Sequence, residues 1–145
     1  MKKYELTDEK IELFGRKLFR IKALKSFGNV KKGELGGYVE KEENLDQTGN
    51  AWVGGNAEVH GNAEVRDDAE VCSEQDVLCV GPIGSRNGTT TFFKTKKKEI
   101  GVKCGCFRGS IDEFERKVES THGTDTKYAK QYKAAIELAK TTINI

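Results

Sequence analysis

The chain is poor in the residues that most catalytic and metal sites need. Its 145 residues include two His, four Cys and one residue each of Pro, Trp and Met. The cysteines are Cys72, Cys79, Cys104 and Cys106. They contain no Cys-x-x-Cys knuckle, the spacing typical of structural zinc sites. We interpret them as reduced cysteines that serve as small hydrophobic residues, with a zinc site as the alternative. We predict no bound metal and no cofactor.

Long apolar segments are also missing. No run approaches the roughly 20 apolar residues that a membrane-spanning helix needs. The N-terminal segment, residues 1–9, contains two lysines, but no apolar core follows them, so we expect no signal peptide. Charged residues make up 33% and hydrophobic residues 36% of the chain, an ordinary composition for a soluble protein. We therefore predict a cytoplasmic location.

The net charge is small, +2, but it is unevenly distributed. Residues 1–40 hold ten Lys and Arg against six Asp and Glu, residues 41–85 hold two against ten, and residues 86–145 hold thirteen against seven. Two interpretations are open. The charged faces are simply solvated and attract one another, or the basic C-terminal part attracts an anionic ligand.

A repeat of six residues dominates the middle of the chain. Valine recurs at positions 53, 59, 65, 71 and 77, and alanine lies two residues before the first four of them, at positions 51, 57, 63 and 69. A period of six fits neither an α-helix nor a simple alternating strand. We interpret each hexad as a short strand and a tight bend, with Val pointing inward and Ala where the interior narrows. Asn50, Asn56, Asn62 and Asp68 occupy the bends, which suit Asx side chains.

This pattern resembles the hexapeptide-repeat family, whose fold is a left-handed parallel β-helix. The resemblance implies a mainly β protein: a short left-handed β-helix with an N-terminal strand cap and a C-terminal ββαα module. We assign residues 1–27 to a hairpin cap, 28–80 to the β-helix and 81–145 to an α+β module. A coil this short has little core of its own, so we expect a homo-oligomer.

Local signals predict the flanking elements. Alternating apolar and polar residues predict a hairpin over residues 11–24, with its turn at Gly15–Arg16. A second antiparallel hairpin is predicted from Thr89–Lys94 and Ile100–Cys104. Ser110 and Glu113 form a capping-box pattern that starts a helix ending near Ser120. A second helix is expected from Asp125 or Thr126 to about Thr141.

Acyl transfer is the first enzymatic possibility, because the hexapeptide-repeat family contains many acyltransferases that use a His as general base. His60 lies at an outward position of the repeat, and it is the candidate catalytic residue under this alternative. The corresponding positions in the neighbouring hexads are Gly54 and Arg66, so a solvated residue would serve equally well there. His122 precedes Gly123 at a predicted helix end, where a cation is favourable for the helix dipole. We favour a protein that is not an enzyme.

A glycine-rich segment, Gly81–Gly88, is the main candidate for ligand binding. Within it, Gly84 allows close backbone approach, and Ser85, Arg86 and Asn87 offer donors suited to phosphate or carboxylate. The predicted site is completed by Lys103, Arg108 and Ser110, the last two at a helix start where anions are favoured. The alternative is a plain chain reversal in which Arg86 pairs with an acidic residue.

Taken over its whole length, the chain resembles small hexapeptide-repeat proteins encoded by bacteriophages and prophages. The resemblance rests on Phe27-Gly-Asn-Val, Leu35-Gly-Gly-Tyr-Val, Gly81-Pro-Ile-Gly-Ser-Arg and Gly105-Cys-Phe-Arg-Gly-Ser. It implies a binding protein in the bacterial host cell that counters host defence, by sequestering a small anionic ligand such as a signalling nucleotide. A second possibility is an inhibitor that blocks a host defence protein directly, with the acidic repeat as a mimic of nucleic acid.

Overall fold

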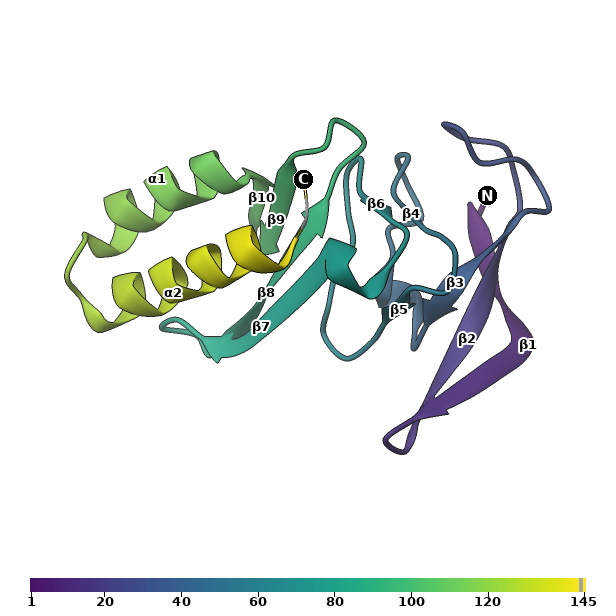
Figure 1. The fold of residues 1–145 in the computed structure, drawn as a ribbon, viewed down its shortest axis with the longest axis horizontal. Coiled ribbons are helices and arrows are strands. Elements are labelled where there is room, and N and C mark those ends of the chain that lie inside the picture. Colours follow the sequence, from purple (N-terminus) through teal and green to yellow (C-terminus); the bar gives the residue numbers. More distant parts are fainter. Residues whose placement is uncertain (144) are drawn as a thin grey trace. The chain divides into compact units, whose positions relative to one another are not determined.

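Strands precede helices along the chain (Figure 1). The computed structural model describes residues 1–143 and 145, and the chain divides into two compact units, Met1–Glu74 and Gln75–Ile145. We call these unit 1 and unit 2. Unit 1 contains β1 (Tyr4–Leu13), β2 (Arg16–Ala23), β3 (Leu35–Val39), the short 3-10 helix η1 (Glu42–Asn44), β4 (Trp52–Val53), β5 (Glu58–Val59) and β6 (Glu70–Val71). Unit 2 contains β7 (Val77–Ile83), β8 (Gly88–Lys94), β9 (Ile100–Cys104), β10 (Phe107–Ser110), α1 (Ile111–His122) and α2 (Lys127–Thr142). The 3-10 turn η2 (Glu74–Asp76) spans the boundary.

The first hairpin follows from the alternation of apolar and polar residues. β1 and β2 pair antiparallel, and Ile21 and Ala23 of β2 are buried. The predicted hairpin over residues 11–24 is therefore confirmed. Its turn lies at Phe14–Gly15, one residue earlier than the predicted Gly15–Arg16. Both turn residues have positive φ, 49° and 81°, the geometry that matches the right-handed twist of a two-residue hairpin.

Short parallel strands follow the hairpin. β3 pairs with β2 antiparallel and with β5 in parallel, which gives the sheet order β1-β2-β3-β5. β4 and β6 form a separate two-stranded parallel sheet, and Leu45 and Val65 form an isolated parallel bridge. Since β4, β5 and β6 are each two residues long, side-chain packing carries more of the stability here than hydrogen-bonded ladders do.

The predicted left-handed β-helix is wrong, and so is the hexapeptide-repeat solenoid on which it rested. The described residues form separate flat sheets of four, two and four strands. The N-terminal hairpin shares a sheet with β3 and β5 instead of capping a coil. The fifth valine, Val77, begins the antiparallel strand β7.

The inward position of the repeated residues is confirmed. The buried repeat residues are Ala51, Val53, Ala57, Val59, Ala63, Val65, Ala69 and Val71. The period of six therefore determines which two side chains of each hexad are buried. It does not determine how the short strands pair into sheets, because that depends on hydrogen bonds between segments far apart in the sequence.

One buried asparagine joins two loops of unit 1. The Asn44 side chain is fully buried. Its Oδ1 accepts hydrogen bonds from the N–H groups of Glu40 and Lys41, at 3.2 and 3.0 Å. Its Nδ2 donates to the carbonyl oxygens of Gly61 and Ala63, at 3.1 and 2.9 Å. The Glu40 N–H also donates to the Val59 carbonyl at 3.1 Å, so Asn44 is the partner of three further backbone groups, the Lys41 N–H and the carbonyls of Gly61 and Ala63.

Two further polar side chains are buried at the N-terminus. Lys3 Nζ donates to the Ala51 carbonyl at 2.7 Å and lies 4.8 Å from the centroid of the Phe27 ring. The Tyr4 hydroxyl lies 2.8 Å from the Glu42 carbonyl oxygen and 2.7 Å from that of Leu45. Burial raises the pKa of Tyr4 well above its ordinary value. These contacts attach the start of β1 to the loops that follow β3.

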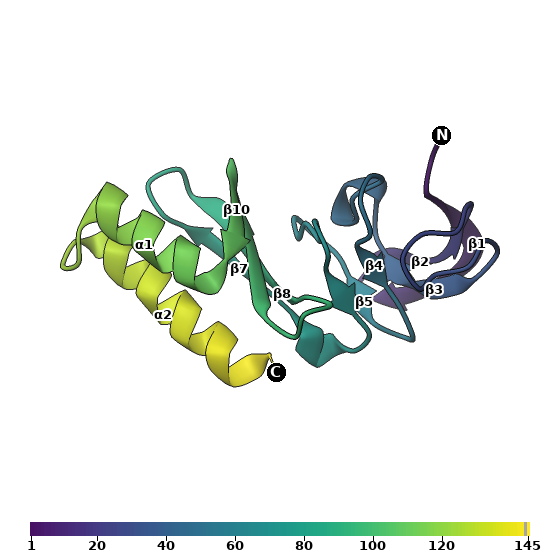
Figure 2. The ribbon, with the colours of Figure 1, turned by 90° about the horizontal axis from the view of Figure 1, so that it is seen from above.

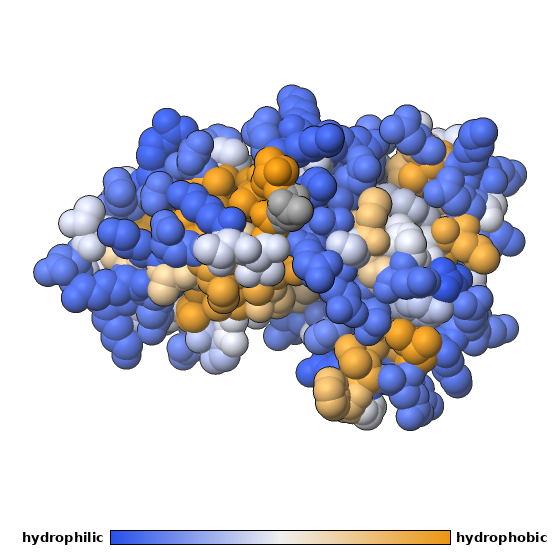
Figure 3. Space-filling view, in the orientation of Figure 1, coloured by the Kyte–Doolittle hydropathy of each residue, from blue (hydrophilic) through white to orange (hydrophobic). Residues whose placement is uncertain are grey.

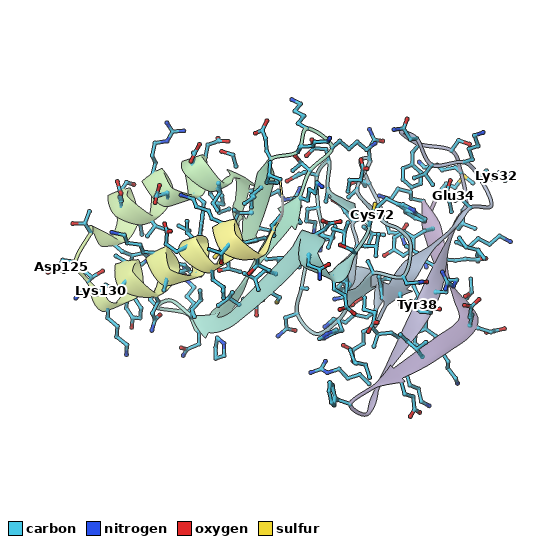
Figure 4. The ribbon with its side chains drawn as sticks, in the orientation of Figure 1. Lys32, Glu34, Tyr38, Cys72, Asp125 and Lys130 are labelled. Atoms are coloured by element: carbon cyan, nitrogen blue, oxygen red, sulfur yellow. The ribbon has the colours of Figure 1, made fainter. Side chains whose placement is uncertain are left out.

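A network around Arg20 links strands β1, β2 and β3 of the first sheet. Arg20 Nε donates to Glu9 Oε2 at 2.6 Å, and Nη1 donates to the Gly36 carbonyl at 2.6 Å. The guanidinium also lies 4.4 Å from the centroid of the Tyr38 ring, and the Tyr38 hydroxyl donates to Glu9 at 3.1 Å. Figure 4 labels Tyr38 on β3. The Arg20 and Tyr38 hydrogen bonds lower the pKa of Glu9.

Acid should weaken unit 1 through Glu40. This carboxylate accepts hydrogen bonds from the Gly61 N–H at 2.7 Å and from Arg16 Nη1 at 2.9 Å, and these bonds, the Gly61 one first, lower the pKa of Glu40. A group with a lowered folded pKa stabilises the fold fully above its unfolded pKa, about 4.3 for Glu. That stabilisation is lost as the pH falls through the folded pKa.

We expect Glu40→Gln to lower the melting temperature of unit 1 by about 2 °C at neutral pH. The difference from the unmodified chain should vanish in strong acid. The fluorescence of Trp52, the one tryptophan of the chain, reports melting of unit 1 across a pH series. Glu5→Gln, at an exposed position of β1, is the matched control and should show no such pH-dependent difference. An equal effect of Glu40→Gln at every pH would contradict this assignment.

Unit 2 is a four-stranded antiparallel sheet with two helices. The strand order is β10-β9-β8-β7, and the predicted pairing of Thr89–Lys94 with Ile100–Cys104 is confirmed. The helices lie side by side on one face of this sheet (Figures 1 and 2). The core between sheet and helices includes Phe92, Val102, Phe114, Val118, Ala135, Ile136 and Ala139.

Both helices begin where the sequence predicts. Ser110 caps α1 by accepting a hydrogen bond from the Glu113 N–H at 3.2 Å, while the Glu113 carboxylate accepts from the Ser110 N–H at 3.1 Å. Thr126 caps α2. In the described residues, neither helix is long and apolar enough to cross a lipid bilayer.

Candidate functional site

The predicted glycine-rich site centres on the turn between β7 and β8. The turn runs over Gly84–Asn87 and is closed by a hydrogen bond from the Asn87 N–H to the Gly84 carbonyl at 3.2 Å. Gly84 and Asn87 have positive φ, 80° and 50°, which glycine and asparagine tolerate best. Ser85, Arg86 and Asn87 are exposed. Their donors therefore face solvent at the end of the sheet.

Gly84 itself has a packing role. A Cβ atom at this position would collide with the Tyr132 hydroxyl of α2. The Gly84 N–H donates to Gln131 Oε1 at 2.8 Å. The absence of a side chain thus lets the turn pack directly against α2. The Gly84 N–H donates to Gln131 and is therefore already engaged in a hydrogen bond within the protein.

Lys103 and Arg108 form a second group. They are direct cross-strand partners on β9 and β10. Their neighbours Val102, Cys104 and Phe107 pack into the core on the helix side, so Lys103 and Arg108 lie on the opposite face of the sheet. Lys103 Nζ also donates to the Gly105 carbonyl, and each of the two cations has a further partner within the chain.

Ser110 is committed to the start of α1. Its hydroxyl and backbone N–H both take part in the capping box with Glu113. Asp112 and Glu113 place two carboxylates in the first turn, where they complement the positive end of the helix dipole. These carboxylates therefore already compensate the positive partial charge at the N-terminus of α1.

The structure thus brings the predicted residues to one end of unit 2 in separate groups. Antiparallel connection places the β7–β8 turn and the β9–β10 turn at the same end of the sheet. Lys103 also lies opposite Thr91 of β8. Thr91 is three residues from Gly88, where β8 begins after the β7–β8 turn. Lys103 and Arg108 therefore lie about 10 Å from that turn along the strand direction. Arg86 belongs to the turn that docks on the helix side, whereas Lys103 and Arg108 lie on the other face.

A polar cluster next to Gly84 was not predicted. Thr90 Oγ1 donates to Cys104 Sγ at 3.2 Å. Burial raises the pKa of Tyr132, and the neighbouring Cys104 thiol adds to this effect through a hydrogen bond. The His122 ring stacks on Tyr132 with centroids 5.7 Å apart. The signal that could have revealed the cluster is the cross-strand register of Thr90 and Cys104.

The structure gives the other candidate residues ordinary surroundings. His60 is exposed at a bend of the repeat. Desolvation raises the pKa of Cys79, which disfavours its thiolate. Among the described residues, no three His, Cys, Asp or Glu side chains gather closely enough to hold a metal ion.

Comparisons with known proteins give no family. No protein-family model matches the chain, and no curated protein matches it. The predicted resemblance to phage-encoded hexapeptide-repeat proteins therefore lacks support from relatives, and the flat sheets of unit 1 contradict its fold.

Proposed function

We propose that this protein binds a small anionic ligand, without reaction, at the end of the unit 2 sheet. The observation that carries the proposal is the direct pairing of Lys103 with Arg108 across β9 and β10. Like charges opposite each other on antiparallel strands repel. An anion that contacts both side chains relieves this repulsion, and Arg86, exposed in the neighbouring turn, adds a third positive charge at the same end.

The charge of unit 2 supports an anionic ligand. Unit 2 contains thirteen Lys and Arg against eight Asp and Glu, whereas unit 1 contains twelve against fifteen. A positive field over unit 2 raises the local concentration of anions and speeds their association.

A phosphate-bearing ligand suits these side chains best. The planar guanidinium group of Arg108 matches the paired oxygens of a phosphate, and Lys103 opposite it supplies a compact positive charge, while Arg86 in the β7–β8 turn adds to the positive field. A nucleotide carries such phosphates. If the ligand is a signalling nucleotide, its sequestration would give the role against host defence that the sequence predicts.

Calorimetry on the whole chain tests the proposal. The panel contains cyclic dinucleotides, cyclic trinucleotides, ADP-ribose and acetyl-coenzyme A. A ligand present at a hundredfold excess over its Kd should raise the free energy of unfolding by about 2.7 kcal/mol. Arg108→Ala and Lys103→Ala should each weaken binding of that compound by about tenfold, the loss expected for one charge-assisted hydrogen bond. Recovery of the intact compound after incubation distinguishes binding from turnover.

Lys97→Ala is the matched control. Lys97 is an exposed lysine in the β8–β9 turn, at the opposite end of the same sheet, so its removal changes the net charge by the same amount without touching the site. The affinity of Lys97→Ala for the ligand should stay within twofold of that of the unmodified chain. Equal losses in Lys97→Ala and Arg108→Ala would show a general charge effect, and full binding in Arg108→Ala would refute the site.

A further inference from the structure

Phe14 occupies a position that folding by itself disfavours. Its side chain is 99% exposed, so it contributes little to the core. Its backbone has a φ of 49°, in the left-handed region that glycine and asparagine adopt readily and that a Cβ-bearing aromatic residue adopts at a cost. An aromatic residue that is both exposed and in the left-handed region points to a contact outside the folded chain.

The hairpin presents Phe14 at its tip. The last residue of β2 that pairs with β3 near this end is Phe19, so three further rungs, about 10 Å, extend beyond the third strand. Ile11 and Leu13, both half-buried, flank the tip. Figure 3 shows hydrophobic side chains gathered at this end of the β1–β2 hairpin. The tip therefore forms a protruding apolar knob.

Basic residues surround this knob. Lys10 and Lys17 are exposed close to the tip, with Glu12 as the cross-strand partner of Lys17. Arg16 follows the turn and pairs with Glu40. The exposed charges next to Phe14 are thus predominantly positive, and a complementary surface would be an apolar pocket with an acidic rim.

Unit 2 contains a pocket of this kind between α1 and α2. Its floor is apolar, formed by Val118, Ala129 and Ile136, and its rim carries Glu115, Glu119 and Lys133. Its volume is about 170 Å³, similar to the cavity of about 150 Å³ that binds benzene in another protein. The pocket lies beside the α1–α2 loop, where Figure 4 labels Asp125 and its ion-pair partner Lys130.

We propose that Phe14 of one copy of this chain inserts into the α1–α2 pocket of a second copy. The phenyl ring matches the pocket in size and would pack on the apolar side chains of Val118, Ala129 and Ile136. Lys17 and Lys10 then approach Glu115 and Glu119, which in the described residues form no ion pair within the chain. This surface is separate from the proposed anion site, so each proposal can fail without the other.

The contact joins the hairpin tip of one copy to the helix pair of another. If two copies exchange tips, both pockets are filled and the assembly closes as a two-fold dimer. If the contact runs from one copy to the next, association continues into a ring or a longer assembly as the protein concentration rises.

Sedimentation velocity over a concentration series tests the contact. The unmodified chain should associate. Phe14→Ser should raise the protein concentration at which half of the chains are associated by about 30-fold, as for loss of a central aromatic anchor. Phe14→Gly should dissociate equally while its melting temperature stays the same or rises, because glycine relieves the left-handed strain. Leu138→Ser, which removes an apolar side chain of α2 that is 49% exposed and lies outside the pocket, should associate like the unmodified chain.

A mixing experiment identifies the partner surface. Thr124 is exposed and lines the pocket, so Thr124→Trp should fill the pocket and prevent association on its own. Phe14→Ser retains an open pocket, and Thr124→Trp retains an intact tip. Mixed together, these two variants should form a one-to-one complex and nothing larger.

Three results would overturn the proposal. They are a monomeric unmodified chain at every concentration, full association of Phe14→Ser, and failure of the two variants to form a complex when mixed. The last result would also exclude the pocket as the receiving surface.

Discussion

Replacing Asn44 by Ala should lower the free energy of unfolding of unit 1 by about 3 kcal/mol, since three backbone groups (the Lys41 N–H and the carbonyls of Gly61 and Ala63) lose their partner and each net hydrogen bond contributes about 1 kcal/mol. Asn44 accepts from the N–H groups of Glu40 and Lys41 and donates to the carbonyls of Gly61 and Ala63. The Asn44 side chain is fully buried, so bulk water does not compete for its hydrogen bonds in the folded protein.

Urea unfolding followed by Trp52 fluorescence measures this loss in unit 1. Circular dichroism at a helical wavelength follows α1 and α2 in unit 2 in the same samples. Asn62→Ala, an exposed asparagine at a bend of the repeat, is the matched control and should change stability by less than about 0.5 kcal/mol. A loss under about 1 kcal/mol for Asn44→Ala would show that the four contacts are not important for stability.

An aspartate at the same position separates charge from size. Asn44→Asp keeps the acceptor and turns a carboxylate toward the carbonyl oxygens of Gly61 and Ala63. A buried carboxylate in such surroundings has a raised pKa. Its folded form is therefore most stable below the unfolded pKa of about 3.9, and its stability falls as the pH rises. We expect the free energy of unfolding of Asn44→Asp to fall further below that of the unmodified chain as the pH rises from 4 to 7, measured by the same fluorescence. Asn44→Ala should show no such trend.

Gly36→Ala is the second substitution with a large expected effect. A Cβ at this position would lie 2.5 Å from the Val53 carbonyl oxygen and 2.7 Å from both Ile21 Cγ1 and Trp52 Cζ2. A backbone oxygen cannot move aside without separating β3 from its neighbours. We expect a loss of about 3 kcal/mol, at the upper end of the range for overpacking in a core.

Gly54→Ala is the matched control for this experiment. A Cβ there would meet its nearest atom at 3.7 Å, an ordinary contact, and the residue has no positive φ. Its stability should stay within about 0.5 kcal/mol of the unmodified chain. Thermal melting by Trp52 fluorescence compares the two variants. Similar melting temperatures for both would refute the tight packing of β3 against the repeat.

The helices show what could be predicted from neighbouring residues. The capping box of Ser110 and Glu113 and the cap at Thr126 are local signals, because each joins groups that lie within three residues of one another. Their hydrogen bonds form wherever the rest of the chain lies. For this reason α1 and α2 lie close to their predicted limits even though the β-helix predicted for the repeat region was wrong.

The candidate site was predictable only in part. Arg86, Lys103 and Arg108 were selected because their chemistry suits anions, and the antiparallel hairpins place them at one end of unit 2. Which face of the sheet each residue occupies depends on register, and a shift of one residue would reverse it. The docking of Gly84 on Tyr132 joins positions 48 residues apart, and no local pattern in the sequence encodes that contact.

Local sequence patterns identify the residues that are buried in the repeat and the starts of both helices, and they place the first hairpin turn to within one residue. These features follow from periodicity and from hydrogen bonds between near neighbours. Three features emerge from the folded structure alone: the repeat forms short strands in separate sheets, Asn44 joins two loops, and Phe14 is exposed at the tip of a hairpin. Such features depend on contacts between distant segments, whose free energies are set by packing of the whole unit and not by any local pattern.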